Sequence, residues 1–135
     1  MALFNVFDIA GSAMSAQALR LNLVASNLAN AGTVAGTPEQ AYKAREPVFA
    51  AALSGARGGT PEVELRGIVT STAPAVPLYQ PNNPLADADG YVYRSNVNTV
   101  EAMVNMISAS RSYQNNVEVM STSRDLLLQT LKLGS

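Results

Sequence analysis

The sequence NVNTVEAMVNMISASRSYQNNVEVMSTSRDLLLQTLKL at residues 96–133 contains neither glycine nor proline and predicts one long helix. Alternating steps of three and four residues from Met103 fall mainly on apolar side chains, as in a helix that lies along a partner. We call these positions the C-terminal seam. Its members are Met103, Met106, Tyr113, Val117, Met120, Leu127 and Leu131.

Both ends of this helix carry local signals. Asn98 and Glu101 have the spacing of a capping box, in which the first side chain accepts from free amides of the first turn. Lys132 falls in the last turn and Gly134 just after it, where a helix end favours a cation and a glycine. The sequence therefore predicts both where the helix starts and where it stops.

The first thirty residues repeat this pattern. Steps of four and three again fall on apolar side chains, which we call the N-terminal seam: Phe7, Met14, Leu21, Val24 and Leu28. Asn5 and Asp8 are predicted to form the N-cap and N3 positions, and Asn30 with Gly32 is predicted to end the helix.

The outer faces of both predicted helices carry few charges and many serine, asparagine and glutamine side chains. A solvated helix in a monomer is usually rich in Glu and Lys, whereas uncharged polar side chains suit a helix surrounded by other helices. A simple antiparallel pair would cover only one side of each helix. We therefore expect an assembly subunit whose isolated terminal helices are only marginally ordered.

The middle of the chain holds most of its prolines and glycines, in short extended runs. Strands are predicted at residues 42–49, 62–72 and 91–93, with a turn at 57–61 and a β-bulge at Gly67. The prolines between residues 74 and 84 predict an extended path without helix.

The predicted fold is mainly α with a small β insert, its two long terminal helices paired antiparallel in coiled-coil fashion. The predicted parts are an N-terminal axial helix at residues 1–33, a β-rich insert with extended loops at 34–96 and a C-terminal axial helix at 97–135.

Composition excludes several classes of protein. Charged residues make up 14% of the 135 residues and the net charge is −1, so nothing favours nucleic acid as a partner. The chain has no cysteine and no histidine, which removes thiolate chemistry, zinc sites and the commonest general base. No run is long enough to span a membrane, and the N-terminus lacks the basic region of a cleavable signal peptide.

The motif Asp87-Ala88-Asp89-Gly90 is similar to the core of a calcium-binding loop. In that template position one would be Leu85 and position twelve Asn96, so two key ligands are missing. The expected role of this motif is a polar turn. We predict no catalytic, cofactor-binding or metal-binding residue in the chain, and no enzymatic activity.

Two stretches resemble a known family. Residues 25–33, with Asn27, Leu28, Ala29 and Asn30, resemble the signature that closes the first helix of flagellar rod and hook proteins, although Gly32 replaces an asparagine. The run through residues 83–118 is similar to that of a proximal rod member of this family. It contains Asp87, Asp89, Gly90, Tyr91, Asn96, Asn98 and Glu101.

The resemblance implies a structural subunit of the bacterial flagellar basal body that polymerises helically into the rod and transmits motor torque. Its implied partners are copies of itself, sibling proximal and distal rod subunits, an adaptor at the rod base and the flagellar type III export apparatus. It implies a rod that spans the periplasm, with no membrane insertion and no cofactor. The alternatives are a small helical-hairpin adaptor or secretion chaperone, and a sibling rod or hook protein.

Overall fold

The structure is a computed structural model that describes residues 2–53 and 59–134. Along the chain, five strands lie between two long helices. The order is α1 (Ala2–Asn30), β1 (Val34–Ala35), β2 (Arg45–Leu53), β3 (Pro61–Thr70), β4 (Val76–Tyr79), β5 (Tyr91–Arg94) and α2 (Thr99–Leu133). This order confirms the predicted mainly α fold with a β insert between the terminal helices.

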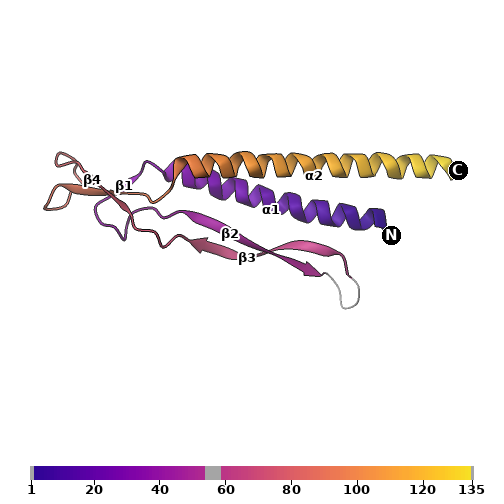
Figure 1. The fold of residues 1–135 in the computed structure, drawn as a ribbon, viewed down its shortest axis with the longest axis horizontal. Helices are drawn as coiled ribbons and strands as arrows, with labels where there is room; N and C mark the ends of the chain where they lie inside the picture. The colour runs from indigo at the N-terminus through magenta and orange to yellow at the C-terminus, as the bar shows by residue number, and fades with distance from the viewer. Residues whose placement is uncertain (1, 54–58, 135) are drawn as a thin grey trace.

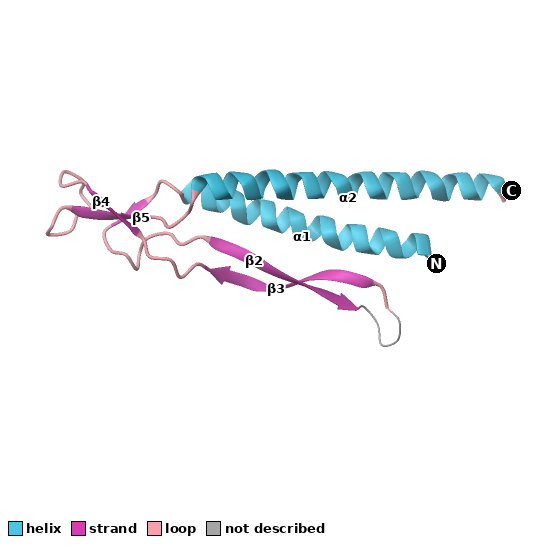
Figure 2. Ribbon diagram, viewed as in Figure 1, coloured by secondary structure: helices cyan, strands magenta, loops and turns pink. Residues whose placement is uncertain are grey.

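The elements form three parallel layers along one axis (Figure 1). α1 and α2 run antiparallel side by side, and the hairpin of β2 and β3 lies along the opposite side of α1 (Figure 2). Within the described residues, α1 is the one element that contacts both α2 and the hairpin. α2 is therefore covered by the chain along one side alone.

α2 begins where the sequence predicts it. The Asn98 side chain accepts from the backbone amides of Val100 at 3.1 Å and Glu101 at 3.2 Å, which makes Asn98 its N-cap. At the other end the Gly134 amide donates to the Thr130 carbonyl at 3.2 Å. Because Gly134 has φ of −95°, the helix ends without the left-handed cap that glycine often supplies.

α1 differs from the prediction at its start. It begins at Ala2, so Asn5 and Asp8 lie inside the helix and Asn5 is not its N-cap. The physical reason is that neither glycine nor proline precedes Asn5, so nothing prevents the helix from continuing toward the N-terminus. The predicted stop is confirmed, because α1 ends at Asn30. The backbone amide and the hydroxyl of Thr33 both donate to the Asn30 carbonyl.

The β2–β3 hairpin is antiparallel, and its register shifts once. Val48 pairs with Gly67 and Phe49 with Leu65, which leaves Arg66 as the extra residue of a β-bulge. The predicted bulge at Gly67 is thus confirmed. The predicted strands are shifted by a few residues at their ends, and part of the predicted turn at 57–61 lies outside the described residues.

The remaining strands form a small sheet in the order β1-β5-β4. The predicted strand at 91–93 is β5, its central strand, and Val92 is fully buried there. β4 was expected only as an extended segment. It forms an edge strand with Pro77 opposite Tyr93, a place where proline costs no ladder bond.

Candidate assembly interface

The contact between α1 and α2 uses small side chains. The buried residues of α2 are Ala102, Ala109 and Ser123, which lie at multiples of seven residues and so face one side. Short side chains let two helix backbones approach closely. On this stripe of α2 the small residues are fully buried, and the larger side chains between them are partly buried.

Four of the seven residues of the predicted C-terminal seam lie on this stripe. These four, Met106, Tyr113, Met120 and Leu127, are partly buried. Met103, Val117 and Leu131 are 55%, 42% and 63% exposed and lie outside the contact with α1. The apolar periodicity thus includes the face that packs inside the chain and also exposed positions beside it or beyond it.

The N-terminal seam lies in a more covered layer, because α1 has neighbours on two sides. Val24 is buried, and Phe7, Met14, Leu21 and Leu28 are partly buried. These side chains belong to the interior of the three-layered unit.

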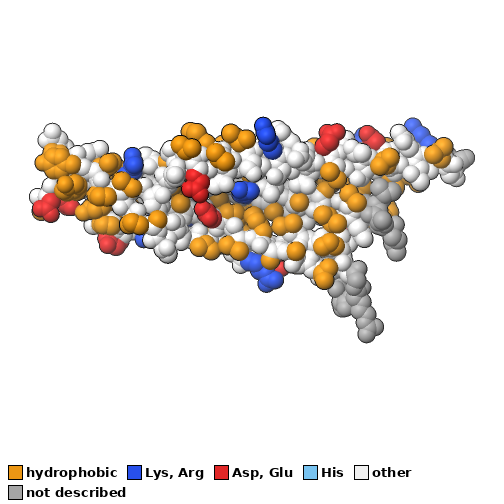
Figure 3. Space-filling model, in the orientation of Figure 1, with side chains coloured by type: hydrophobic (Ala, Val, Ile, Leu, Met, Phe, Trp, Pro, Cys, Tyr) orange, Lys and Arg blue, Asp and Glu red, His pale blue; other side chains and the backbone are white. Residues whose placement is uncertain are grey.

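α2 leaves a large apolar surface open to solvent. Figure 3 shows apolar side chains gathered along α2 and at both ends of the molecule. The exposed large apolar residues of α2 are Val100, Met103, Val104, Ile107, Val117, Val119, Leu126, Leu128, Leu131 and Leu133. A helix of a monomer rarely exposes so many large apolar side chains, and extensive exposed apolar surface marks an interaction site.

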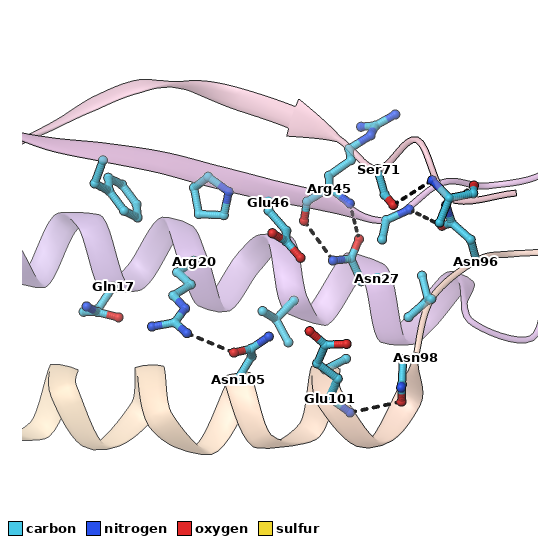
Figure 4. A pocket seen from close by; sticks show the side chains of 17 residues that line it. Gln17, Arg20, Asn27, Arg45, Glu46, Ser71, Asn96, Asn98, Glu101 and Asn105 are labelled. Carbon is cyan, nitrogen blue, oxygen red and sulfur yellow. Dashed lines mark hydrogen bonds between the residues drawn. The ribbon is translucent and has the colours of Figure 1, made fainter.

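Asn27 fastens the hairpin to the end of α1 (Figure 4). Its side-chain NH2 donates to the Arg45 carbonyl at 2.9 Å, and its oxygen accepts from the Arg45 amide at 3.0 Å. The same oxygen accepts from the Tyr42 hydroxyl at 2.9 Å. Asn27 is 5% exposed, so its side-chain amide supplies the hydrogen bonds that water would otherwise make to the backbone of Arg45, the first residue of β2.

The Asn96 side chain also binds backbone groups, one just before β2 and one after β3. Its oxygen accepts from the Ala44 amide at 2.7 Å, and its NH2 donates to the Ala73 carbonyl at 2.8 Å. Ser95 is buried and its hydroxyl accepts from the Val97 amide, just before the Asn98 cap. We call Asn27, Asn96 and Asn98 the asparagine junction. It joins α1, the hairpin and the start of α2.

An open groove of about 610 Å³ lies between the two helices and the hairpin beside this junction. Arg20 donates to the Asn105 side chain across it at 3.0 Å, which ties α1 to α2. The side-chain oxygen of Gln17, which also lines the groove, is buried without a hydrogen-bond partner. Among the described residues, no group of three or more acidic, histidine or cysteine side chains is placed to hold a metal.

The motif at Asp87 is a turn held by its carboxylate. One oxygen accepts from the amides of Asp89 at 3.0 Å and Tyr91 at 2.9 Å, and the other from the Tyr93 hydroxyl at 2.9 Å. Gly90 completes the turn with φ of +82°, in the region that favours glycine. The predicted polar turn is confirmed.

The same contacts shift two pKa values. The Tyr91 amide, and then the Tyr93 hydroxyl, lower the pKa of Asp87 because both bonds favour the ionised carboxylate. In return the carboxylate raises the pKa of Tyr93, since its hydroxyl must stay protonated to donate. The turn is therefore most stable with Asp87 charged and Tyr93 neutral.

Sequence reasoning found the asparagines through the motifs that contain them, but it missed Tyr42 and Ser95. Tyr42 was assigned to a strand, yet it lies before β2, and its hydroxyl reaches both Asn27 and Ser26. Nothing in the local sequence marks the contacts of Tyr42, because they join segments that are distant along the chain.

Comparison with known proteins identifies two matching families. The family described as flagella basal body rod protein matches residues 7–35, and that of the flagellar basal body rod FlgEFG protein C-terminal region matches residues 88–133. The first match covers Asn27, and the second covers the Asp89–Tyr93 segment and all of α2. Both helices thus fall within known rod-protein regions.

Full-length relatives agree with these matches. The flagellar basal-body rod protein FlgC of Salmonella typhimurium is 53% identical over 136 residues, covering 99% of each chain. That of Escherichia coli O157:H7 is 54% identical with the same coverage. That of Buchnera aphidicola from Acyrthosiphon pisum is 42% identical over 138 residues, again at 99% coverage. In the part of the chain that the structure describes, no helix is long and apolar enough to cross a membrane.

Proposed function

Because this chain belongs to the FlgC family of flagellar basal-body rod proteins and is a structural subunit of the rod, we propose that it polymerises helically through α1 and α2. The observation that carries this proposal is the mismatch on α2. This helix fully buries only alanine and serine side chains, keeps four larger seam side chains partly buried and leaves ten large apolar side chains exposed. Burying those side chains against neighbouring subunits is what stabilises a polymer.

In this proposal the members of both seams that remain accessible pack against other subunits. The pairing of α1 and α2 continues in coiled-coil fashion through the assembled rod, and the β2–β3 hairpin lies farther from the axis. The rigid three-layered unit, fixed by the asparagine junction, then passes torque from one subunit to the next as part of the drive shaft.

The proposed partners are other copies of the chain, sibling proximal and distal rod subunits and the adaptor at the rod base. We propose that the chain reaches the rod through the flagellar type III export apparatus and lies in the periplasmic span of the basal body. A helical-hairpin adaptor or secretion chaperone would gain nothing from ten turns of helix with an open apolar face.

The test is incorporation into basal bodies. In cells that lack the natural gene, Val117→Asp is expected to abolish incorporation and swimming, because assembly would bury an unpaired carboxylate. Since Val117 is 42% exposed in the free chain, the purified variant should keep its fold. Val117→Asn is the matched control, because asparagine has nearly the size of aspartate and no charge. Leu28→Asp is also expected to abolish incorporation, but Leu28 is partly buried within the chain, so Val117→Asp is the variant that separates assembly from folding.

Normal swimming by Val117→Asp cells would contradict the proposal. So would a chain that is exported and folded but absent from purified basal bodies of the wild type, because a rod subunit must be found there.

A further inference from the structure

α2 carries a short apolar ridge near its start. Four large side chains at spacings of three, four and seven residues lie on the same side of the helix. Figure 3 shows apolar side chains gathered along the outer side of this first part of α2. We call these residues the α2 ridge, and all are more than half exposed: Val100 (70%), Met103 (55%), Val104 (60%) and Ile107 (57%).

The α2 ridge lies away from the rest of the chain. At 100° per residue, its members centre about 150° around α2 from Ala102, which is buried against α1. Among the described helices and strands, α1 alone contacts α2, so none of them covers the ridge. Apolar side chains at this spacing are those with which a helix enters the groove of a partner.

The groove beside the asparagine junction opens on a different side of the molecule. Its lining is partly apolar, with Val24 from α1, Pro47 and Phe49 from β2, and Val97. At about 610 Å³ it is as large as many sites that enclose a small ligand, so it has room for several side chains.

The groove also presents oxygen atoms that lack donors. The side-chain oxygen of Gln17 is buried without a hydrogen-bond partner, which is costly for a folded chain. The carboxylates of Glu46 and Glu101 point into the groove (Figure 4) and form no ion pair within the described residues. An occupant that brings a hydrogen-bond donor and a positive charge would satisfy both.

Two arginines line the same groove but are already engaged. Arg20 donates to the Asn105 side chain at 3.0 Å. The Arg45 guanidinium lies over the Tyr42 ring, 5.8 Å from its centroid, and points away from the groove in Figure 4. The charges that point into the groove are therefore two acids and one base.

A cation without a partner lies at the end of the α2 ridge. Arg111 follows Ile107 by one turn on the same side, and it forms no ion pair or side-chain hydrogen bond among the described residues. Counting equal numbers of residues from the Arg20–Asn105 bond along the antiparallel helices places Gln17 about three residues, or roughly 4.5 Å, from the height of Arg111. Ridge and groove thus lie at the same height, with the cation and the unpaired oxygen toward the same end.

We propose that the α2 ridge of one copy enters the groove of a neighbouring copy, where Arg111 donates to the Gln17 oxygen. This inference rests on the proposed function, because a helical polymer of one chain needs two different surfaces that fit each other. Ridge and groove are two such surfaces, one apolar with a free cation and the other with acids and a free acceptor. A contact of ridge with ridge would close as a dimer and leave the groove without a donor.

The places of the two surfaces also make the assembly curve. The ridge lies about 150° from Ala102 in one sense, and the groove residues Glu101 and Asn105 lie about 80° from it in the other. The two surfaces are therefore about 130° apart around α2 instead of opposite each other. Copies joined in this way turn by roughly 50° in the same sense and curl around an axis along the helices.

Paired cysteines test the contact in purified basal bodies. The natural chain has no cysteine, so a chain with Met103→Cys and Glu46→Cys has only these two thiols. Within one copy they cannot meet, because the ridge faces away from α1 and β2 lies on the other side of α1 (Figure 2). After oxidation with copper phenanthroline, we expect disulfide-linked dimers and larger multimers on a non-reducing gel. Ser121→Cys replaces Met103→Cys in the control, since it lies on the same side of α2 five turns away, and should give none.

Photocrosslinking identifies the partner independently. A benzophenone amino acid is introduced genetically in place of Ile107, and the crosslinked peptide is identified by mass spectrometry after irradiation. We expect crosslinks to the groove of another copy of this chain, within residues 44–49. The same amino acid in place of Ser121 should not reach these residues.

Charge substitution supplies a third measurement. Ile107→Glu is expected to lower the amount of chain in basal bodies at least about tenfold, since a carboxylate would enter a groove that already holds acids. Gln114→Glu adds the same charge beyond the ridge and should assemble as the natural chain does. Because Ile107 is exposed in the free chain, the purified Ile107→Glu variant should keep the helix content of the natural chain.

Several results would overturn the inference. Crosslinks from Ile107 to a different rod protein would assign the ridge to another subunit, and dimers formed by Met103→Cys alone would assign it to a ridge-to-ridge contact. If the double-cysteine chain fails to assemble, the photocrosslinks decide, and assembled basal bodies without them would show that the groove is not the partner. In each case the chain is present in the rod, whereas its absence there would instead contradict the proposed function.

Discussion

Replacing Asn27 by alanine tests whether the asparagine junction holds the hairpin on α1. The substitution removes three hydrogen bonds, to both backbone groups of Arg45 and to the Tyr42 hydroxyl. Each contributes about 1 kcal/mol net, and alanine returns roughly 0.6 kcal/mol through its higher helix propensity. Asn27 lines the open groove, so water can reach the abandoned groups and limit the loss. We expect a net destabilisation of about 2 kcal/mol.

The assay is hydrogen exchange of the Arg45 amide, together with urea denaturation of the purified chain. A loss of about 2 kcal/mol corresponds to roughly 30-fold faster exchange where opening of the junction controls it. Asn30→Ala is the control from the same sequence motif, because the Asn30 side chain donates only to the Ser26 carbonyl within α1. Its effect should be a few tenths of a kcal/mol.

A double-mutant cycle with Tyr42→Phe sharpens the test. Since the Tyr42 hydroxyl donates to Asn27, the two substitutions remove one shared bond and their costs should not add. The reasoning is refuted if Asn27→Ala costs no more than Asn30→Ala, or if the effects of Asn27→Ala and Tyr42→Phe are simply additive.

Four further predictions concern the turn and the helix ends. Because the pKa of Asp87 is lowered from 3.8, its contribution to stability is present above that pH and is lost as the pH falls further, while the raised pKa of Tyr93 keeps its contribution until the pH rises above 10.0. NMR titration should therefore show an intact turn between these limits and an opened one outside them. Gly90→Ala should cost about 1–2 kcal/mol in urea denaturation, since φ is +82° and the added carbon would meet the Tyr79 ring at 2.9 Å; an unchanged midpoint would disprove the strain. Asn98→Ala should cost about 1 kcal/mol and fray the start of α2, whereas Asn98→Ser should retain most of the cap, as measured by amide exchange at Glu101. Circular dichroism of the isolated chain should show less helix than α1 and α2 contain together, because the end of α2 extends past α1 (Figure 1); full helix content with one cooperative melt would contradict this.

The sequence predicted the elements whose signals are local. The start of α2 follows from Asn98, whose side chain caps the residues directly after it, and the bulge follows from a glycine inside an apolar strand. The start of α1 was placed too late because a polar residue that can cap a helix does not have to do so. β4 was missed because its partners Tyr91 and Tyr93 come from a separate segment. In addition, Pro77 argues against a strand unless the strand lies at the edge of a sheet.

The C-terminal seam shows what apolar periodicity alone does not determine. Apolar periodicity identifies a face that avoids water, but it does not say whether that face is covered by the same chain or by another. On α2 the apolar pattern includes positions of both kinds. Ala109 packs inside the chain, whereas Val117 belongs to the neighbouring exposed line. The sequence analysis singled out the large apolar positions, whereas the fully buried residues of α2 are small ones whose size lets α1 approach.

On α2, the fully buried side chains are small, and most of the large apolar side chains are left for contacts with other subunits. Burying an alanine or serine yields little, at about 0.8 kcal/mol per CH2 group, so the fully buried Ala102, Ala109 and Ser123 contribute little, and the larger side chains between them are only partly covered. A leucine such as Leu131 contributes about 1.5–3 kcal/mol when it is covered, but here that happens only against another subunit. The free energy that orders α2 therefore becomes available mainly on assembly. A subunit built in this way keeps its junction and hairpin as a preformed guide, and its longest helix is fixed by the neighbours that it joins.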